Sequence, residues 1–112
     1  MACTLCAIAS GEQKAKIAHQ DPYSLTYEDP VPKAPFHFIV FPKKHVESMR
    51  DWRTEDAPML GRVMLEIARV AHHSKIDETG CRIVLNDGGK GHVGRHVHFH
   101  VLGGRTFAWP PG

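Results

Sequence analysis

The stretch from residue 96 to residue 102, HVHFHVL, places a histidine at every second position, with branched or aromatic apolar residues between the histidines. In an extended strand successive side chains point to opposite faces, so His96, His98 and His100 are expected on one face of a sheet. Neighbouring imidazoles would lie about 6.6 Å apart, because a strand rises roughly 3.3 Å per residue. The apolar residues between them fall on the other face, where they can enter a core. Such a row suits an extended anionic ligand or, together with other segments, a metal ion.

Short strand patterns fill much of the remaining chain. Strands are predicted over residues 16–20, 24–28, 36–41 and 82–86, and the third of these is the dense apolar run FHFIVF. The glycine-rich loop 87–91 returns the chain into the histidine strand, which predicts an antiparallel hairpin.

One long helix is predicted between these strands, with Thr54 as its N-cap. Its apolar residues recur at three- and four-residue spacing, which indicates an amphipathic helix packed against the sheet: Leu60, Val63, Met64, Ile67, Val70 and Ala71. A short helical turn is expected over residues 3–9, ending by Gly11. The sequence therefore predicts an α+β fold, an antiparallel sheet with one long helix, in a single domain spanning residues 1–112.

Composition excludes several classes of protein. A net charge of +2 is too small for bulk nucleic-acid binding through phosphate contacts. Residues 1–10 lack the basic and apolar regions of a secretory signal, and no stretch approaches the roughly 20 apolar residues of a membrane span. The odd number of cysteines, three, argues against a disulfide framework. We expect a soluble cytoplasmic protein with no membrane or nucleic-acid partner.

The alternation of histidine and apolar residues in HVHFHVL is the signature of the histidine triad (HIT) family, and the chain resembles its branch of histidine triad nucleotide-binding proteins. The similarity covers nearly the whole chain, through these segments: Ala34-Pro35-Phe36-His37-Phe38, Pro42-Lys43-Lys44-His45, Gly103-Gly104-Arg105 and Trp109-Pro110-Pro111-Gly112. The resemblance implies the same antiparallel α+β fold, a twofold homodimer and a purine nucleotide substrate.

The resemblance also assigns catalytic roles. Neutral imidazole is a good nucleophile near pH 7, and its phosphorus adduct is reactive enough for water to complete a transfer. By position in the family, His98 attacks the α-phosphate, while His100 and His37 hold the phosphate oxygens. Asn86 matches a family position near the scissile phosphate. Without the resemblance, His37 would be interpreted as a buried core histidine.

The nucleotide contacts implied by the resemblance lie in three further segments. Asp29 matches the position that holds the ribose hydroxyls, for which a carboxylate is a suitable acceptor. Gly91 and Val93 lie in the loop that rounds the nucleotide. The tail carrying Trp109 reaches toward the partner's active site and shapes preference for the leaving group.

The loop before the histidines departs from the family pattern. The branch commonly has a serine there, which donates a proton to the leaving group, whereas this chain has Val93 and is one residue shorter. Val93 has no side-chain donor. His92, His96 or water are the open alternatives for this proton.

Two cysteines near the amino terminus form a C-x2-C pair, and thiolates with imidazoles are the ligands that tetrahedral zinc prefers. Some bacterial-type members of the family hold zinc in this way, and the equivalent ligands here are Cys3, Cys6, His45 and His96. This zinc would be structural, and no metal is required for catalysis. A redox pair or a reduced, metal-free pair are the alternatives. Cys81 is expected to be an isolated thiol.

The leading functional hypothesis is a purine nucleoside phosphoramidate hydrolase that acts through a nucleotidyl-histidine. Other branches of the family use the same residues as dinucleoside polyphosphate hydrolases or nucleotidylyltransferases, although the WPPG ending weighs against them. A nucleotide- and zinc-binding interaction module with little turnover is the alternative from another class, and a purely structural zinc domain is a further one.

Overall fold

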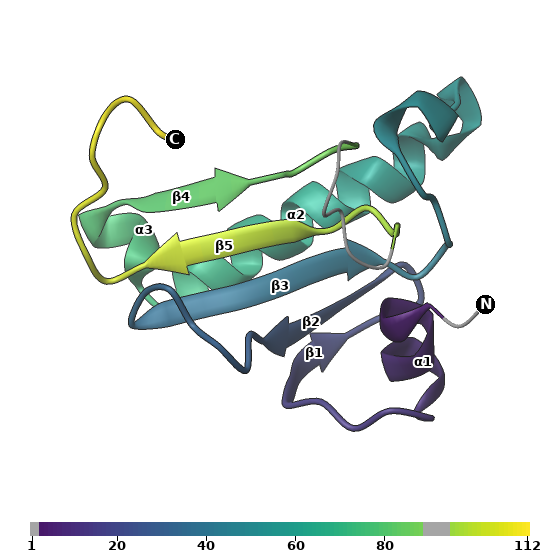
Figure 1. The fold of residues 1–112 in the computed structure, drawn as a ribbon, viewed down its shortest axis with the longest axis horizontal. Helices are drawn as coiled ribbons and strands as arrows, with labels where there is room; N and C mark the ends of the chain where they lie inside the picture. Colours follow the sequence, from purple (N-terminus) through teal and green to yellow (C-terminus); the bar gives the residue numbers. More distant parts are fainter. Residues whose placement is uncertain (1–2, 89–94) are drawn as a thin grey trace.

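The computed structural model describes residues 3–88 and 95–112. Its elements follow in the order α1 (Thr4–Ser10), β1 (Ile17–Gln20), β2 (Ser24–Glu28), β3 (Phe36–Pro42), η1 (Met49–Asp51), η2 (Thr54–Asp56), α2 (Ala57–His73), α3 (Ile76–Thr79), β4 (Cys81–Val84) and β5 (Phe99–Gly103). The five strands form one sheet in the order β1-β2-β3-β5-β4, and every neighbouring pair is antiparallel (Figure 1). The α+β fold and the β4–β5 pairing predicted from the sequence are confirmed.

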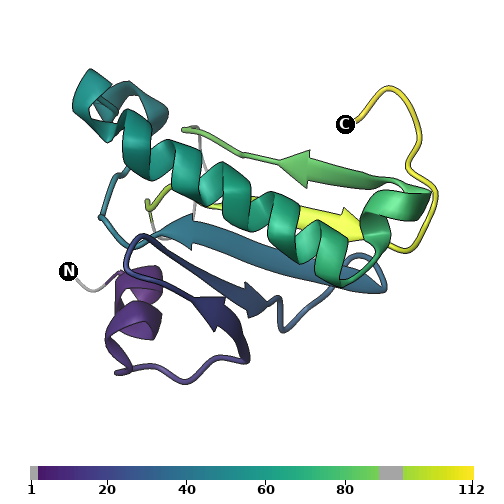
Figure 2. The same ribbon diagram turned by 180° about the vertical axis from the view of Figure 1, so that it is seen from behind.

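Alternation along β3 divides the core between the two faces of the sheet. Ile39 and Phe41 pack with Leu5 and Ile8 of α1, whereas Val40 packs with residues of α2 on the opposite face. Helix α2 runs along that second face over much of its length (Figure 2). Since side chains two residues apart share a face, the His37 side chain lies on the α1 face. The face without α2 is therefore the one that can present histidines to a ligand.

Helix α2 begins differently from the prediction. Thr54 opens the short helix η2, and the N-cap of α2 is Asp56. The carboxylate of Asp56 accepts a hydrogen bond from the main-chain N–H of Arg53 at 3.0 Å, and Lys44 donates to the same carboxylate. Pro58 then lies in the first turn, where a missing N–H costs no hydrogen bond. The N-cap prediction at Thr54 was wrong because the acidic residue two positions later ties this turn together.

The buried face of α2 also differs from the prediction at Met64, which is 52% exposed. Glu66 is buried instead, on the side of the helix that faces β2. Its carboxylate accepts hydrogen bonds from Thr26 Oγ1 at 2.8 Å and from Arg69 Nε and Nη2 at 2.8 and 2.9 Å. Burial alone would raise the pKa of Glu66, but the bonds from Arg69 and Thr26 outweigh it and lower the pKa. One flank of α2 is thus held by an ion pair between the buried Glu66 carboxylate and the half-exposed Arg69 side chain.

Strand β4 covers residues 81–84, so Asn86 lies beyond the strand rather than within it, as the predicted range 82–86 had it. Before β4, the chain forms the short helix α3, which the sequence analysis did not predict. Ile76 of α3 packs so closely on Gly103 that a Cβ there would lie 2.5 Å from the Ile76 Cβ. This close approach explains the glycine at the end of β5. Within the described residues, no helix combines the length and apolar character that crossing a membrane requires.

Candidate active site and metal cluster

The three histidines do not share one strand, which corrects the sequence prediction. Strand β5 begins at Phe99, so His100 lies in the strand while His96 and His98 precede it. The N–H of Val97 donates to the carbonyl of Val46 at 2.8 Å, because the chain here lies against the segment that follows β3. The side chain of His96 is completely buried and packs in a T-shaped contact with the Phe41 ring, with centroids 5.3 Å apart.

His98 is oriented by the main chain. Its Nδ1 lies 2.8 Å from the carbonyl oxygen of His96, so Nδ1 carries the ring proton and donates it. In this tautomer the lone pair of a neutral imidazole is on Nε2. The rings of His98 and His100 have centroids 5.1 Å apart, so Nε2 of His98 can act as a nucleophile beside His100.

A partly buried series of hydrogen-bonding contacts connects His37 with His100 and Asp29. The main-chain N–H of Lys33 donates to Nδ1 of His37 at 3.0 Å, which leaves the single proton of a neutral ring on Nε2. That Nε2 lies 2.9 Å from Nδ1 of His100 and 3.3 Å from Oδ2 of Asp29. When His100 accepts this proton at Nδ1, its own proton is on Nε2. His100 is then a neutral donor for an oxyanion.

The surroundings of His37 and His100 favour the neutral form of both rings. Burial lowers the pKa of His37 below 6.5, and the charge of Lys33 adds to the effect while Asp29 opposes it. Burial also lowers the pKa of His100, with further contributions from His98 and His37. A neutral pair at physiological pH can donate or pass on a proton without carrying a buried charge.

Cys3, Cys6, His45 and His96 come together as the sequence predicted for the metal ligands, although they lie up to 93 positions apart. Nδ1 of His96 lies 3.3 Å from Cys3 Sγ, 3.6 Å from Cys6 Sγ and 3.2 Å from His45 Nδ1. Cys6 Sγ and His45 Nδ1 are 3.3 Å apart. Zinc bonds of about 2.3 Å to sulfur and 2.0 Å to nitrogen set tetrahedral ligands roughly 3.3–3.8 Å apart. The four residues therefore fit a zinc ion in number, type and spacing.

The outer ring nitrogens support the same fit. Nε2 of His96 donates to the carbonyl of Pro42 at 2.7 Å, so Nδ1 keeps a lone pair directed at the two sulfurs. Nε2 of His45 lies 3.8 Å from the Glu47 carboxylate. Without a cation, burial and the neighbouring Cys3 raise the pKa of Cys6 to about 11, so a metal is what would hold this thiol ionised.

A second group of possible ligands, Asp29, His37 and His100, is equally compact, but its hydrogen bonds argue against a metal. The nitrogen of His37 that faces the other two residues carries the ring proton, because Lys33 occupies Nδ1 as a donor. A protonated ring nitrogen cannot bind a metal. This group is therefore suited to sharing a proton, whereas the cysteine-containing group is suited to zinc.

Asp29 borders a cavity of about 430 Å³ that the sequence analysis did not anticipate. Its apolar walls include Ile8, Tyr27 and Pro30, and polar side chains such as Gln13 line it as well. A cavity of this size and character accommodates a flat heteroaromatic ring. No sequence motif identifies residues 4–16 as a binding segment. Ile8 has the pattern of an ordinary core residue of α1, and it does pack in the hydrophobic core as well as line the cavity.

The remaining predicted site residues are less closely associated with the histidines. Asn86 is exposed, two residues beyond β4. Gly91 and Val93, together with the alternative donor His92, lie outside the described residues. Trp109 is 83% exposed on the tail that follows β5.

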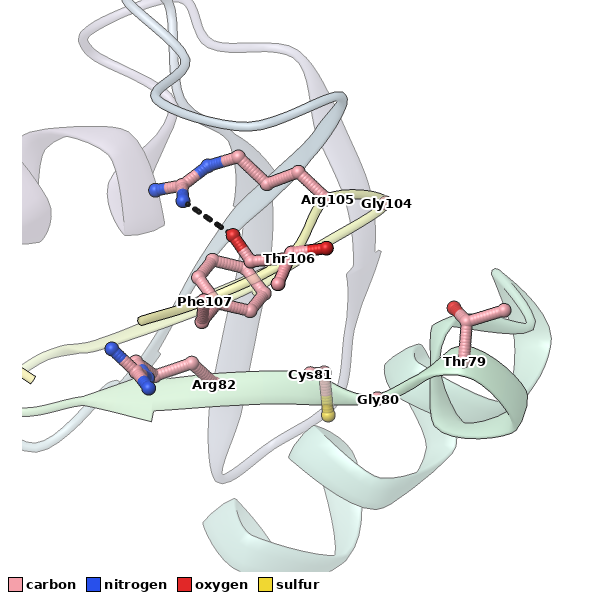
Figure 3. Close-up of a pocket in the computed structure, with 8 residues that line it drawn as sticks. All are labelled: Thr79, Gly80, Cys81, Arg82, Gly104, Arg105, Thr106 and Phe107. Atoms are coloured by element: carbon pink, nitrogen blue, oxygen red, sulfur yellow. Dashed lines mark hydrogen bonds between the residues drawn. The ribbon is translucent and has the colours of Figure 1, made fainter. Parts of the chain in front are cut away.

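The tail is fastened to β4 by a stack of three side chains. Figure 3 shows the Phe107 ring between the guanidinium groups of Arg105 and Arg82, which lie 4.4 and 5.2 Å from its centroid. Arg82 also donates to the carbonyl of Ala108 at 2.9 Å. A hollow of about 580 Å³ adjoins this stack, and the histidines do not line it. The stack places the tail, and with it Trp109, relative to the sheet.

Comparisons with known proteins agree with this geometry. The model of the HIT domain family matches residues 10–107. An uncharacterized HIT-like protein of Synechococcus elongatus is 36% identical over 102 residues, which cover 90% of this chain and 89% of that protein. One from Synechocystis sp. is 37% identical over 102 residues, with the same two coverages, 90% and 89%. Among solved structures, a HIT family hydrolase from Legionella pneumophila is similar with a TM-score of 0.94 at 36% identity, covering 99% of this chain and 100% of that chain.

Proposed function

The chain belongs to the HIT domain family, and on that premise we propose that it hydrolyses purine nucleoside 5′-phosphoramidates. The reaction breaks the bond between the α-phosphorus and the nitrogen of the leaving amine, and it releases a nucleoside monophosphate. The observation that carries the proposal is the pairing of His98 with His100, in which one ring offers a nucleophilic nitrogen and its neighbour a ring proton. The Legionella relative is named a hydrolase, which supports this reaction class.

The first step is attack by Nε2 of His98 on the α-phosphorus. A nitrogen–phosphorus bond forms to the enzyme while the bond to the amine breaks. The amine leaves with a proton taken from water, and the water that attacks in the second step returns a proton to the solvent. The bond from Nδ1 of His98 to the His96 carbonyl supports this step, because it stabilises the ring as it becomes positively charged.

His100 and His37 stabilise the charge on the phosphate oxygens. Nε2–H of His100 donates to one oxygen, and His37 fixes that tautomer through its own proton. Water then attacks phosphorus on the opposite side from His98 and regenerates the free ring. Asn86, Gly91 and Val93 keep their predicted places near the phosphate as part of this proposal.

Asp29 and the cavity beside it hold the nucleoside. The carboxylate accepts hydrogen bonds from the ribose hydroxyls, and the base enters the cavity against Ile8 and Tyr27. The position of Asp29 supports this arrangement, since it borders the cavity and also faces His37.

Zinc at Cys3, Cys6, His45 and His96 is proposed as a structural ion. Four protein ligands would leave no open position on the ion, so its role would be to add rigidity. It would join the amino-terminal helix to the segment that follows β3, which carries His45, and to the segment that precedes β5, which carries His96. The bond from Nε2 of His96 to the Pro42 carbonyl supports this assignment, as does the Glu47 carboxylate 3.8 Å from Nε2 of His45.

A twofold homodimer through β4 is the proposed assembly. Among the described residues no strand pairs with the outer edge of β4, and an open edge is a template for a second strand. Ile83 is 39% exposed on this strand. Met64 lies two residues before Glu66, and therefore on the opposite flank of α2, and it is 52% exposed. In such a dimer the tail of each chain carries Trp109 toward the partner's site.

Turnover of adenosine 5′-phosphoramidate beside a diadenosine polyphosphate tests the function. We expect the phosphoramidate to be preferred, and His98→Ala to lower kcat by roughly 10³-fold or more. His73→Ala, at an exposed histidine in the last turn of α2, is the matched control and should keep full activity. Preference for the polyphosphate, or near-normal turnover in His98→Ala, would overturn the proposal.

A further inference from the structure

The hydrogen on Nε2 of His37 has two acceptors within reach. Nδ1 of His100 lies 2.9 Å away and Oδ2 of Asp29 lies 3.3 Å away. The His37 side chain is 2% exposed and that of Asp29 is 13% exposed, so bulk water does not replace either contact. A single hydrogen makes one strong bond, and the two acceptors therefore compete for it.

Asp29 cannot move away from this competition in the free protein. Its Oδ1 accepts the N–H of Val31 at 2.8 Å, and its main-chain N–H donates to the carbonyl of His37 at 3.0 Å. Both contacts hold Oδ2 opposite Nε2 of His37. Beyond His37, no donor to Oδ2 is found among residues 3–88 and 95–112.

We propose that Asp29 is a positioning residue that couples recognition of the ribose to the phosphate-binding histidine. The inference rests on the proposed function, since it requires a nucleotide whose ribose hydroxyls donate to Asp29. When the diol donates to Oδ2, the carboxylate attracts the His37 hydrogen less strongly. That hydrogen then bonds to Nδ1 of His100, and His100 is fixed with its proton on Nε2, facing the phosphate.

A substrate that lacks the hydroxyls leaves Asp29 as a competitor for the His37 hydrogen. Nδ1 of His100 then loses its donor for part of the time, and with it the contact that fixes the catalytic tautomer. The sugar thus contributes to the transition state as well as to binding. Loss of the diol should lower kcat, whereas a simple binding contact would change KM alone.

The kinetic test compares adenosine 5′-phosphoramidate with its 2′,3′-dideoxy analogue. In the wild-type protein we expect kcat to fall by about tenfold for the dideoxy substrate. In Asp29→Asn the amide oxygen is a weaker acceptor, so kcat should differ by less than about twofold between the two substrates.

Asp21→Asn is the matched control. Asp21-Pro22-Tyr23 forms the same turn as Asp29-Pro30-Val31, with Oδ1 of Asp21 accepting the N–H of Tyr23 at 2.8 Å, but it contacts neither His37 nor His100. This variant should keep the wild-type ratio of kcat values.

A readout independent of turnover is the ¹⁵N spectrum of the histidine rings, with saturating adenosine monophosphate or its 2′,3′-dideoxy analogue as the probe. We expect the ribonucleotide alone to shift His100 fully to the form protonated on Nε2. If the two substrates share one kcat, or if the two nucleotides give the same ring spectra, the coupling is wrong and the proposed hydrolase stands. If the ribonucleoside phosphoramidate is neither bound nor turned over, the proposed function fails and the coupling fails with it.

Discussion

The carbonyl oxygen of His96 accepts the Nδ1 proton of His98 at 2.8 Å, while the His96 side chain lies among Cys3, Cys6 and His45. One residue thus belongs to the metal cluster by its ring and to the nucleophile by its main chain. Its second ring nitrogen donates to Pro42 at the end of β3. The position of the proposed nucleophile therefore depends on how firmly this buried ring is held.

Replacing a cysteine of the cluster should remove the metal and loosen this arrangement. Cys6→Ser is expected to weaken zinc binding by roughly 100-fold or more, because outer-shell changes alone cost 10–100-fold. The melting temperature should fall with the lost zinc, since an ion that binds only the folded chain stabilises it. Metal analysis and thermal unfolding measure both effects.

Cys81→Ser is the control for this prediction, because Cys81 is an exposed free thiol on β4. It should retain one zinc per chain and the wild-type melting temperature. Equal zinc content in both variants, or no zinc in the wild-type protein purified with zinc present, would contradict the assignment.

Lys33→Met should make the two buried histidines easier to protonate. The charge of Lys33 lowers the pKa of both His37 and His100, so its loss raises both values. We expect the imidazole resonances of both histidines to titrate at higher pH in the variant. The acidic side of the pH–activity profile should also move to higher pH. Lys43→Met is the control, because Lys43 bonds to Gln20 and acts on neither pKa.

The same pKa shifts set how stability depends on pH. Both histidines have a lower pKa in the folded chain than the 6.5 of the unfolded chain. The unfolded chain therefore binds more protons once the pH falls below about 6.5, and the free energy of unfolding decreases from there down to the folded pKa values. Lys33→Met reduces the difference between the folded and unfolded pKa values of the two histidines. The variant should therefore lose less stability at acidic pH, and urea denaturation at several pH values would measure this. An equal or larger loss in the variant would contradict the assignment of the charge effect to Lys33.

Filling the cavity beside Asp29 should weaken binding without changing the chemistry. Ala15 is half-buried and lines the cavity, so Ala15→Leu places three further carbons where the base is proposed to lie. We expect KM for the phosphoramidate to rise by roughly tenfold with kcat almost unchanged. Ala18→Leu, on the exposed strand β1 and not in the cavity wall, should leave both constants unchanged. A kcat loss without a KM change would place the base elsewhere.

Periodicity was sufficient to predict most of the sheet and the position of α2. It could not predict that β5 begins only at Phe99, because the bond from Val97 to Val46 that precedes it is a contact between segments 51 positions apart. Likewise, Glu66 on α2 looks like a solvent-exposed residue in sequence, and only its contact with Thr26 on β2 explains its burial.

The site residues likewise divide into those that the sequence predicts and those that depend on contacts between distant segments. The four proposed zinc ligands were predicted together because the resemblance to the family assigns all four positions. The proton shared by Asp29, His37 and His100 was not predicted. It depends on which ring nitrogen the N–H of Lys33 reaches, and residue type alone does not encode that.

Ile83→Asp should separate the proposed dimer. Ile83 is 39% exposed on the open edge strand β4, and in the proposed twofold contact each chain would bring one aspartate into the same interface, where a charge is costly to bury. We expect the wild-type protein to sediment as a dimer and the variant as a monomer at the same concentration. Val31→Asp is the control: Val31 is even more exposed, at 65%, but it lies in the loop between β2 and β3, far along the sheet from β4. A dimer that survives Ile83→Asp and dissociates with Val31→Asp would move the interface from β4 to the loop between β2 and β3, and would contradict the proposed assembly.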